Sequence, residues 1–230
     1  MEGLDFSNKY VFPVHIGGEE FYITQSIIST WIVMAALIIF ALVVRFSISR
    51  FKQVPKGFQN VVEIIGEVVN TFTISTMGER NKRFAAFYGS VFLFLLFSNL
   101  WGLLGMRPPT SDLATTFGLA LMTFVMVQYY GIKTGGIKNY IKGFFEPLPF
   151  LLPLNVIGEL ATPVSLSFRL FGNIVAGVII MGLIYAALPG LTKIGVPAVL
   201  HVYFDVFSGA LQAFIFVMLS MIFVSNAIQE

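Results

Sequence analysis

The 230-residue sequence contains no cysteine and little charge. Without a thiol, the chain can form no disulfide, no thiolate metal site and no cysteine nucleophile. Charged residues make up 11% of the sequence, whereas a soluble globular protein has about 25%. Hydrophobic residues make up 57%. Because so little charge cannot cover a surface that faces water, the composition predicts a polytopic membrane protein.

Other absences narrow the possible functions. The net charge is only +2 and the basic residues are scattered, so no nucleic-acid partner is expected. The sequence has neither a Gly-x-x-x-x-Gly-Lys-Ser/Thr loop nor a His-Glu-x-x-His motif, which bind nucleotide phosphates and metal ions respectively. We therefore predict no catalytic residue, no metal site and no cofactor. Any nucleotide chemistry must be carried out by another chain.

Five long, mostly uncharged runs are each sufficient to cross a bilayer, which takes about 20 helical residues. We expect membrane helices at 21–44, 84–106, 113–132, 147–189 and 197–228. The last two runs are longer than a bilayer requires, which predicts two long helices that tilt as a hairpin. The expected fold is an all-α polytopic membrane protein whose residues 1–230 form a single membrane domain. The acidic start of the chain differs from a basic secretory signal, so the first run is expected to remain as an anchor.

The distribution of basic residues predicts the orientation. If the N-terminus is external, the five spans place ten basic residues on the cytoplasmic side: Arg45, Arg50, Lys52, Lys56, Arg80, Lys82, Arg83, Lys133, Lys138 and Lys142. Only Lys9, Arg107 and Lys193 then lie outside. This bias follows the positive-inside rule. We therefore expect an external N-terminal segment, residues 1–20, and a cytoplasmic C-terminus.

Two further segments have polar residues on one helical face. Within 57–77, the polar residues Asn60, Glu63, Glu67 and Asn70 recur at steps of three and four, with apolar residues between them. This spacing predicts an amphipathic helix, which we place at the cytoplasmic interface or against another helix. The shorter segment 137–146 has the same pattern. On this pattern, both are interpreted as interfacial packing helices.

Arg169 is the basic residue that the topology leaves inside the membrane. An arginine at the centre of a membrane helix costs about 2.5–3.5 kcal/mol on insertion scales. One alternative is an internal ion pair with Glu159 or Asp205, the acids embedded in the last two spans. We favour a functional role, because ionisable residues within membrane helices usually mark an ion or substrate path.

Polar residues near Arg169 share helical faces. Ser165, Arg169 and Asn173 lie four residues apart and fall on one face of a helix. In the last span, a second stripe is spaced at steps of four, three and four: His201, Asp205, Ser208 and Gln212. Two such stripes facing a common partner or cavity predict an ion path. The alternative is a hydrogen-bonded seam between helices, which serine and amide side chains commonly form in membranes.

The acids lie on opposite sides of the arginine. Glu159 precedes Arg169 by ten residues, roughly 15 Å along a helix, and so lies nearer the cytoplasmic side. Asp205 lies on the external side, because the last helix runs from outside to inside. The hypothesis is that two aqueous entrances are separated by one positive charge.

Two segments closely resemble subunit a of F-type ATP synthases. The first is Pro163-Val-Ser-Leu-Ser-Phe-Arg-Leu-Phe-Gly-Asn173, and the second is Gln212-Ala-Phe-Ile-Phe-Val-Met-Leu-Ser220. Weaker similarities are Ser98-Asn-Leu100 and Pro109-Thr-Ser-Asp112. The resemblance covers essentially the whole chain from the first span onward.

This resemblance implies a mechanism and partners. Subunit a is the stator against which a ring of c subunits turns, and two offset half-channels carry H⁺ or Na⁺ to and from the ring carboxylates. Arg169 would meet each carboxylate and separate the half-channels. Asn173 and Gln212 match positions near that arginine, and Asp205 matches a channel-lining position. The implied setting is the whole complex in a bacterial plasma (inner) membrane, with peripheral-stalk b subunits as further partners.

The chain departs from the family pattern at Val178, where many relatives carry a glutamate that is thought to line a half-channel. We therefore expect the external path to use other groups, namely Asp112, His201 and Asp205. The sequence does not distinguish H⁺ from Na⁺ as the transported ion.

Two other functions were considered. An ion-coupled secondary transporter would use buried Arg, Asp and His to bind its substrate, but such proteins often show repeated halves, and five spans divide poorly into two. A purely structural role for the chain would not explain why Arg169 is kept inside the membrane despite its unfavourable insertion free energy.

Overall fold

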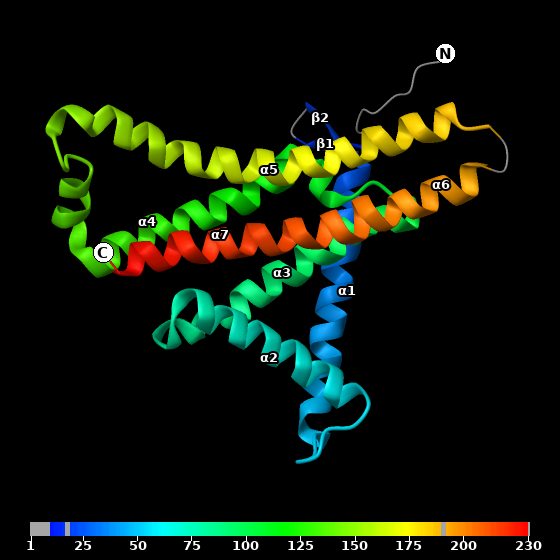
Figure 1. Cartoon of the computed structure of the whole chain (residues 1–230), viewed down its shortest axis with the longest axis horizontal. Coiled ribbons are helices and arrows are strands. Elements are labelled where there is room, and N and C mark those ends of the chain that lie inside the picture. Colours follow the sequence, from blue (N-terminus) through cyan, green and yellow to red (C-terminus); the bar gives the residue numbers. More distant parts are fainter. Residues whose placement is uncertain (1–9, 17–18, 190–191, 230) are drawn as a thin grey trace.

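The computed structural model describes residues 10–16, 19–189 and 192–229, which are mostly helical. Figure 1 shows α5 and α7 side by side along the longest dimension of the molecule, with α4 beside them and α1 crossing their direction steeply. The α-helices are α1 (Gln25–Ser47), α2 (Phe58–Met77), α3 (Ala85–Leu100), α4 (Leu113–Gly143), α5 (Leu152–Ala187), α6 (Thr192–His201) and α7 (Gly209–Gln229).

The prediction of five membrane helices is confirmed. In the described part of the chain, five helical stretches are long and apolar enough to cross a membrane: Gln25–Arg50, Glu79–Leu104, Leu113–Gly143, Pro149–Ala187 and Gly195–Ile228. Short 3-10 turns lengthen α1, α3 and α5 at their ends: η1 (Ile48–Arg50), η2 (Glu79–Phe84), η3 (Trp101–Leu104) and η5 (Pro149–Leu151). A further 3-10 turn, η4 (Pro109–Ser111), is separated from α4 by the extended residue Asp112.

The first helix begins later than expected. Residues 21–24 belong to strand β2 (Glu19–Thr24), which pairs antiparallel with β1 (Tyr10–Ile16). Aromatic and β-branched residues dominate this segment and favour a strand. The start of the first span at residue 21 is therefore wrong, and helix α1 begins at Gln25.

The third helix continues beyond residue 132, where the sequence placed its end. Helix α4 runs to Gly143, with a kink at Gly136, whose φ is 75° and ψ is 154°. Glycine adopts this left-handed region without the steric cost that a Cβ imposes. The separate segment predicted at 137–146 is thus largely the last part of α4, turned by the kink.

The last two membrane helices are long. Helix α5 has 36 residues, roughly 54 Å at 1.5 Å per residue, and continues through Pro163. The final span consists of α6, a π-helical stretch η6 (Val202–Ser208) and α7. Because a hydrocarbon core is about 30 Å thick, helices of this length must tilt to keep their apolar residues in lipid.

Helix α2 occupies most of the segment 57–77, and the amphipathic character expected there remains a prediction. Its residues Phe58, Val61, Ile64 and Val68 are exposed apolar side chains, and Glu63 and Glu67 are exposed as well. Its position at the cytoplasmic interface remains a prediction.

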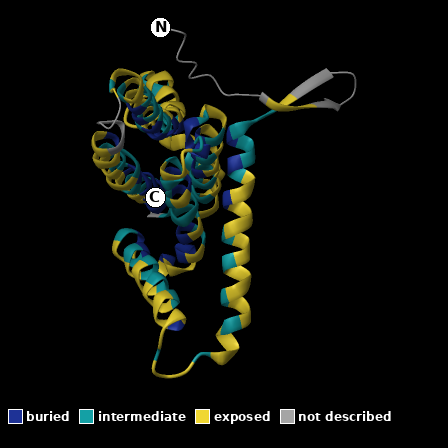
Figure 2. Cartoon of the chain, turned by 90° about the vertical axis from the view of Figure 1, so that its right-hand side faces the viewer, coloured by how far each residue is buried: buried dark blue, intermediate teal, exposed yellow. Residues whose placement is uncertain are grey.

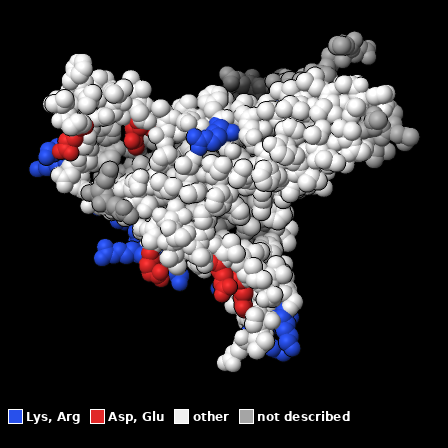
Figure 3. Space-filling model, in the orientation of Figure 1, with Lys and Arg blue, Asp and Glu red and all other residues white. Residues whose placement is uncertain are grey.

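The buried core lies where α3, α4, α5 and α7 meet, whereas α1 is largely exposed (Figure 2). The largest fully buried side chains include Tyr88, Leu95, Leu170, Phe216 and Met221. Most of the surface in Figure 3 carries no charge, and its charged side chains gather mainly towards the left and lower margins. This distribution fits a bundle whose outer surface faces hydrocarbon.

Small polar side chains connect the core helices. Thr116 of α4 is hydrogen-bonded to Ser167 of α5 at 3.2 Å, and Thr123 of α4 to Ser220 of α7 at 2.8 Å. Lipid provides little hydrophobic drive for helix association, so such bonds and close packing hold membrane helices together. The Thr116–Ser167 contact helps to fix which face of α5 turns inward.

Asn99, near the end of α3, joins three segments. Its Nδ2 donates to the carbonyl of Gly209 at 2.8 Å, and its Oδ1 accepts from the Thr110 hydroxyl at 2.8 Å. A Cβ on Gly209 would lie 3.0 Å from the Asn99 Cβ, so glycine permits this close approach. Asn99 therefore anchors the start of α7 to α3 and η4.

Replacing Asn99 with alanine should destabilise the chain by about 1–3 kcal/mol, the cost of leaving buried polar groups without partners. Thermal unfolding of the full chain in detergent measures the effect. Asn60→Ala, on the exposed side of α2, serves as the control and should leave the midpoint unchanged. Equal midpoints for both variants would contradict the anchoring role of Asn99.

Candidate functional site

Helix α5 has an inner and an outer face near its centre. Leu166, Ser167 and Leu170 are buried against the other helices, whereas Ser165 and Arg169 are exposed. Successive residues of a helix differ by roughly 100° in direction, so packing of the first group turns the second group outward. The predicted common face of Ser165 and Arg169 is therefore the outer face of α5.

Arg169 makes no hydrogen bond or ion pair with any residue that the structure describes. The alternative of an internal ion pair with Glu159 or Asp205 is therefore not realised in the described chain. The guanidinium instead points away from the bundle, where a group of another molecule can reach it.

The two predicted polar stripes meet at Asn173 and Ser208. The Asn173 Nδ2 lies 2.9 Å from the Ser208 Oγ, and the Ser208 hydroxyl lies 3.2 Å from the Asn173 Oδ1. Asn173 is one helical turn beyond Arg169. This contact holds α5 against the end of η6 close to the arginine.

A second polar group joins α5 to the start of the last span. The His201 Nδ1 and the Asp205 Oδ2 are 2.5 Å apart, and the Tyr185 hydroxyl lies 3.1 Å from the His201 Nε2. A Cβ on Gly102 would lie 3.0 Å from the Asp205 Oδ1, so the glycine in η3 leaves room for the carboxylate. We call Tyr185, His201 and Asp205 the histidine cluster.

The stripe predicted over His201, Asp205, Ser208 and Gln212 is divided in the structure. Gln212 is 6% exposed and points into the bundle, where its Nε2 has no partner among the described residues. The π-helical stretch from Val202 to Ser208 explains the difference. A π-turn has more residues per turn than an α-helix, so it rotates the residues beyond it relative to those before it.

Glu159 belongs to a third group, at the other end of α5 from the histidine cluster. Its Oε1 accepts a hydrogen bond from the Gln128 Nε2 at 2.7 Å, and the Tyr140 hydroxyl donates to the Gln128 Oε1. The Asn155 Nδ2 donates to the carbonyls of Phe144 and Glu146, at 2.9 and 3.1 Å.

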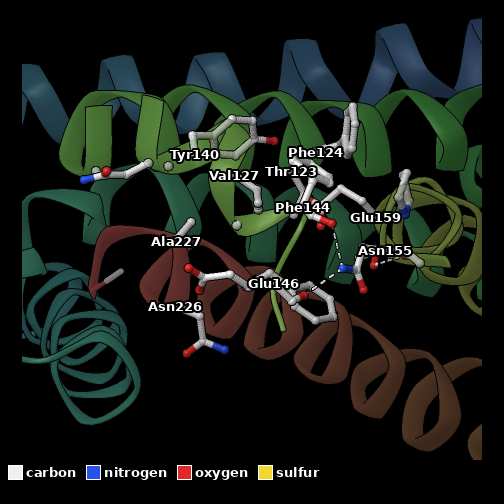
Figure 4. A pocket seen from close by; sticks show the side chains of 18 of the residues that line it. Thr123, Phe124, Val127, Tyr140, Phe144, Glu146, Asn155, Glu159, Asn226 and Ala227 are labelled. Atoms are coloured by element: carbon white, nitrogen blue, oxygen red, sulfur yellow. Dashed lines mark hydrogen bonds between the residues drawn. The ribbon is translucent and has the colours of Figure 1, made fainter. Parts of the chain in front are cut away.

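Glu159, Tyr140 and Asn155 line a cavity of about 890 Å³ between α4, α5, α7 and the connection after Gly143. Figure 4 shows Glu159, Asn155, Tyr140 and Asn226 around it. The cavity is large enough for many water molecules, because one water occupies about 30 Å³. Its wall carries the carboxylates of Glu159 and Glu146 and several amides, and Glu146 is paired with Lys142, so polar groups suited to water surround the cavity.

Asp112 has a structural position. Its Oδ1 accepts from the Ala114 backbone N–H at 3.0 Å and so caps the N-terminus of α4, and its Oδ2 accepts from the Ser26 hydroxyl at 3.0 Å. The carboxylate therefore ties α1 to the start of α4. Its expected part in an external path remains a prediction.

Two contributing residues were missed from the sequence. Gln128 is an amide within an otherwise apolar run, a signal that could have identified it. Tyr185 lies sixteen residues after Arg169, roughly 160° around an ideal helix, so spacing alone could not join it to the arginine's stripe. Over the ranges that the structure describes, no group of three or more His, Cys, Asp or Glu side chains could hold a metal ion.

Comparison with known proteins places this arrangement in a family. Residues 27–225 match the family described as the ATP synthase A chain. The chain is 38% identical over 240 residues to "ATP synthase subunit a, sodium ion specific" of Propionigenium modestum, covering 97% of this chain and 78% of that protein. It is 36% identical over 223 residues to ATP synthase subunit a of Moorella thermoacetica, covering 94% and 97% of the two chains.

A chloroplast relative is also similar. The chain is 35% identical over 218 residues to ATP synthase subunit a of Oedogonium cardiacum, covering 90% of this chain and 83% of that protein. The family match reaches into all five membrane helices, and Arg169 and the histidine cluster lie within the matched range. The chain therefore belongs to the ATP synthase subunit a family.

Proposed function

We propose that this chain is the stator ion channel of an F-type ATP synthase, with Arg169 separating two half-channels that lead to the carboxylates of a c-ring. Ions moving through the half-channels would drive rotation and ATP synthesis, while other chains carry out the nucleotide chemistry. The proposed location is the bacterial plasma membrane, with an external N-terminus, a cytoplasmic C-terminus and peripheral-stalk b subunits as neighbours.

The observation that carries the proposal is the position of Arg169. The arginine lies exposed on the outer face of a long apolar helix and has no counter-charge among the described residues. A permanent charge is costly in hydrocarbon, and a passing carboxylate on a partner would neutralise it. An outward arginine is therefore suited to meet a rotating ring.

The chemistry of arginine supports this role. Its guanidinium stays protonated at any physiological pH, so it repels cations without carrying a proton itself. At 4 Å, two unit charges interact by about 4 kcal/mol at an effective dielectric constant of 20. An energy of this size, about a thousandfold in an equilibrium constant, is sufficient to displace a bound ion from a carboxylate and to block leakage.

The two polar groups on either side of Arg169 supply the proposed routes. The histidine cluster would form the external route, and the cavity beside Glu159 the cytoplasmic route. Glu159 is roughly 15 Å and Tyr185 roughly 24 Å from Arg169 along α5 at 1.5 Å per residue. This separation supports two entrances that meet only at the arginine and the ring.

In the proposal, His201 passes protons between its neighbours. A neutral imidazole accepts a hydrogen bond on one ring nitrogen and donates on the other, and its two nitrogens face the Tyr185 hydroxyl and the Asp205 carboxylate. His201 and Asp205 would then supply the ionisable groups that the chain lacks at Val178, where many relatives carry an acid. The coupling ion in the proposal is H⁺ or Na⁺.

The position of Arg169 also distinguishes the stator from a secondary transporter. A transporter binds its substrate near the membrane midplane between structural repeats, so its arginine should point into the bundle. Here Arg169 is exposed, and the uncharged side chains of Leu166, Ser167 and Leu170 occupy the inner face of α5. The geometry favours a partner outside the chain.

Replacing Arg169 with alanine should reduce ion-driven ATP synthesis to background while leaving the complex assembled, because the separating charge is lost but no hydrogen bond or ion pair among the described residues is. ATP synthesis by the purified complex in proteoliposomes measures the effect. Arg50→Ala, an exposed base at the end of α1, is the matched control and should retain activity. Normal synthesis by the Arg169→Ala complex would refute the proposed function.

Replacing Tyr185 with phenylalanine should slow ATP-driven pumping of the coupling ion several-fold, because the hydroxyl that contacts His201 is lost while the ring remains. Quenching of a pH-sensitive dye measures H⁺ pumping, and uptake of labelled Na⁺ measures Na⁺ pumping. Tyr203→Phe removes a hydroxyl from an exposed tyrosine of η6 and should have no effect. Equal rates in both variants would show that the histidine cluster lies outside the path.

A further inference from the structure

A groove lies on the outer surface between η2, α3 and α4, away from Arg169. It has a volume of about 460 Å³. Phe87, Val125 and Met126 form its apolar part, and Arg83, Tyr129 and Tyr130 form its polar part. The proposed ion path uses none of these residues.

Two basic side chains stand over the aromatic rings of this groove. The Arg83 guanidinium carbon lies 5.1 Å from the Phe84 ring centroid and 5.8 Å from that of Tyr130. The Lys133 Nζ lies 5.3 Å from the Tyr129 centroid and donates to the Tyr129 hydroxyl at 3.3 Å. Cation–π contacts of this kind hold a basic group in place without neutralising it.

Neither base has a carboxylate partner in the part of the chain that the structure describes. Arg80 and Lys82 lie in the same short helix as Arg83, against one acid, Glu79. The end of the groove beside Arg83 and Lys133 therefore carries a net positive charge.

The groove spans the depth at which phospholipid headgroups meet hydrocarbon. Arg83 immediately precedes the apolar run that begins at residue 84, and Lys133 immediately follows the run that ends at residue 132. Tyr129 is exposed at this level and Tyr130 is half-buried, and tyrosines are enriched at the membrane–water interface. Val125 lies one turn further into the span and is 61% exposed, so the apolar floor is open towards the lipid chains.

We propose that this groove binds an anionic phospholipid, with its phosphate between Arg83 and Lys133 and an acyl chain along Phe87, Val125 and Met126. Basic pockets between membrane helices are suited to such headgroups. Charge complementarity determines the headgroup, and the apolar floor determines that the ligand is a lipid rather than a free anion. The inference does not depend on the role of Arg169.

The test uses the intact ATP synthase complex in phosphatidylcholine vesicles that contain a trace of photoactivatable phosphatidylglycerol or of photoactivatable phosphatidylcholine. Illumination is followed by mass spectrometric mapping of the labelled peptides. We expect phosphatidylglycerol to label the peptides containing Phe87 and Val125 roughly 30-fold more than phosphatidylcholine does, as two basic groups near a membrane surface imply.

Three variants test the assignment. The Arg83→Gln/Lys133→Gln double variant should lower labelling by phosphatidylglycerol to the phosphatidylcholine level. Val125→Trp fills the floor, keeps both bases and should also lower labelling of the Phe87 peptide. Arg45→Gln/Arg50→Gln removes the same charge from the end of α1, away from the groove, and should leave labelling unchanged.

Several results would overturn the proposal. Equal labelling by the two lipids, or equal loss in the Arg45→Gln/Arg50→Gln control, would show only general attraction to the membrane surface. Full displacement of the lipid by added inorganic phosphate would assign the groove to a free anion. Protection of the groove from both lipids in the wild-type complex would assign it to a protein partner instead.

Discussion

The positive charge of Arg169, which has no counter-charge among the described residues, is the constraint on which the rest of the structure depends. A charge of this kind in a membrane helix is costly unless something neutralises it. The chain directs it outward by burying Leu166, Ser167 and Leu170 on the opposite face of α5. In the proposed function, a partner rather than the chain itself neutralises this charge, and the exposed side chain takes part in ion transport.

The orientation of α5 depends on polar contacts between helices. Hydrophobic burial cannot distinguish one apolar face from another when the surroundings are also apolar. The bond from Thr116 to Ser167 fixes the rotation of α5 against α4, and the contact of Asn173 with Ser208 fixes it against the last span. Together they hold the inner face of α5 against the bundle, so Arg169 remains on the outer surface.

Much of the fold could be predicted from the sequence, because a shortage of charge over about 20 residues is a strong signal for a membrane helix. The five helices and the long final pair followed from it. The ends of the helices were less predictable, since they depend on local backbone conformation. Phe21 lies in a strand, and the left-handed backbone of Gly136 redirects α4.

The candidate site was predictable only in part. Arg169 and Asn173 stood out through their motif and spacing, and the structure places Asn173 against Ser208 as two facing stripes require. The predicted polar stripe of the last span does not extend to Gln212, which is buried in the bundle. A π-helical stretch before it changes the number of residues per turn. The partners Gln128 and Tyr185 come from positions that no single helical face includes, so only the packed structure brings them to Glu159 and His201.

The most direct test of two half-channels separated by Arg169 is cysteine accessibility. This chain contains no native cysteine, so within it a thiol reagent labels only the introduced position. Gly158→Cys lines the cavity beside Glu159, and Val178→Cys lies beyond Arg169 towards the histidine cluster. In the assembled complex, a membrane-impermeant thiol reagent should reach Gly158→Cys only from the cytoplasmic side and Val178→Cys only from the external side. Labelling of both positions from the same side would show one continuous path and contradict the account.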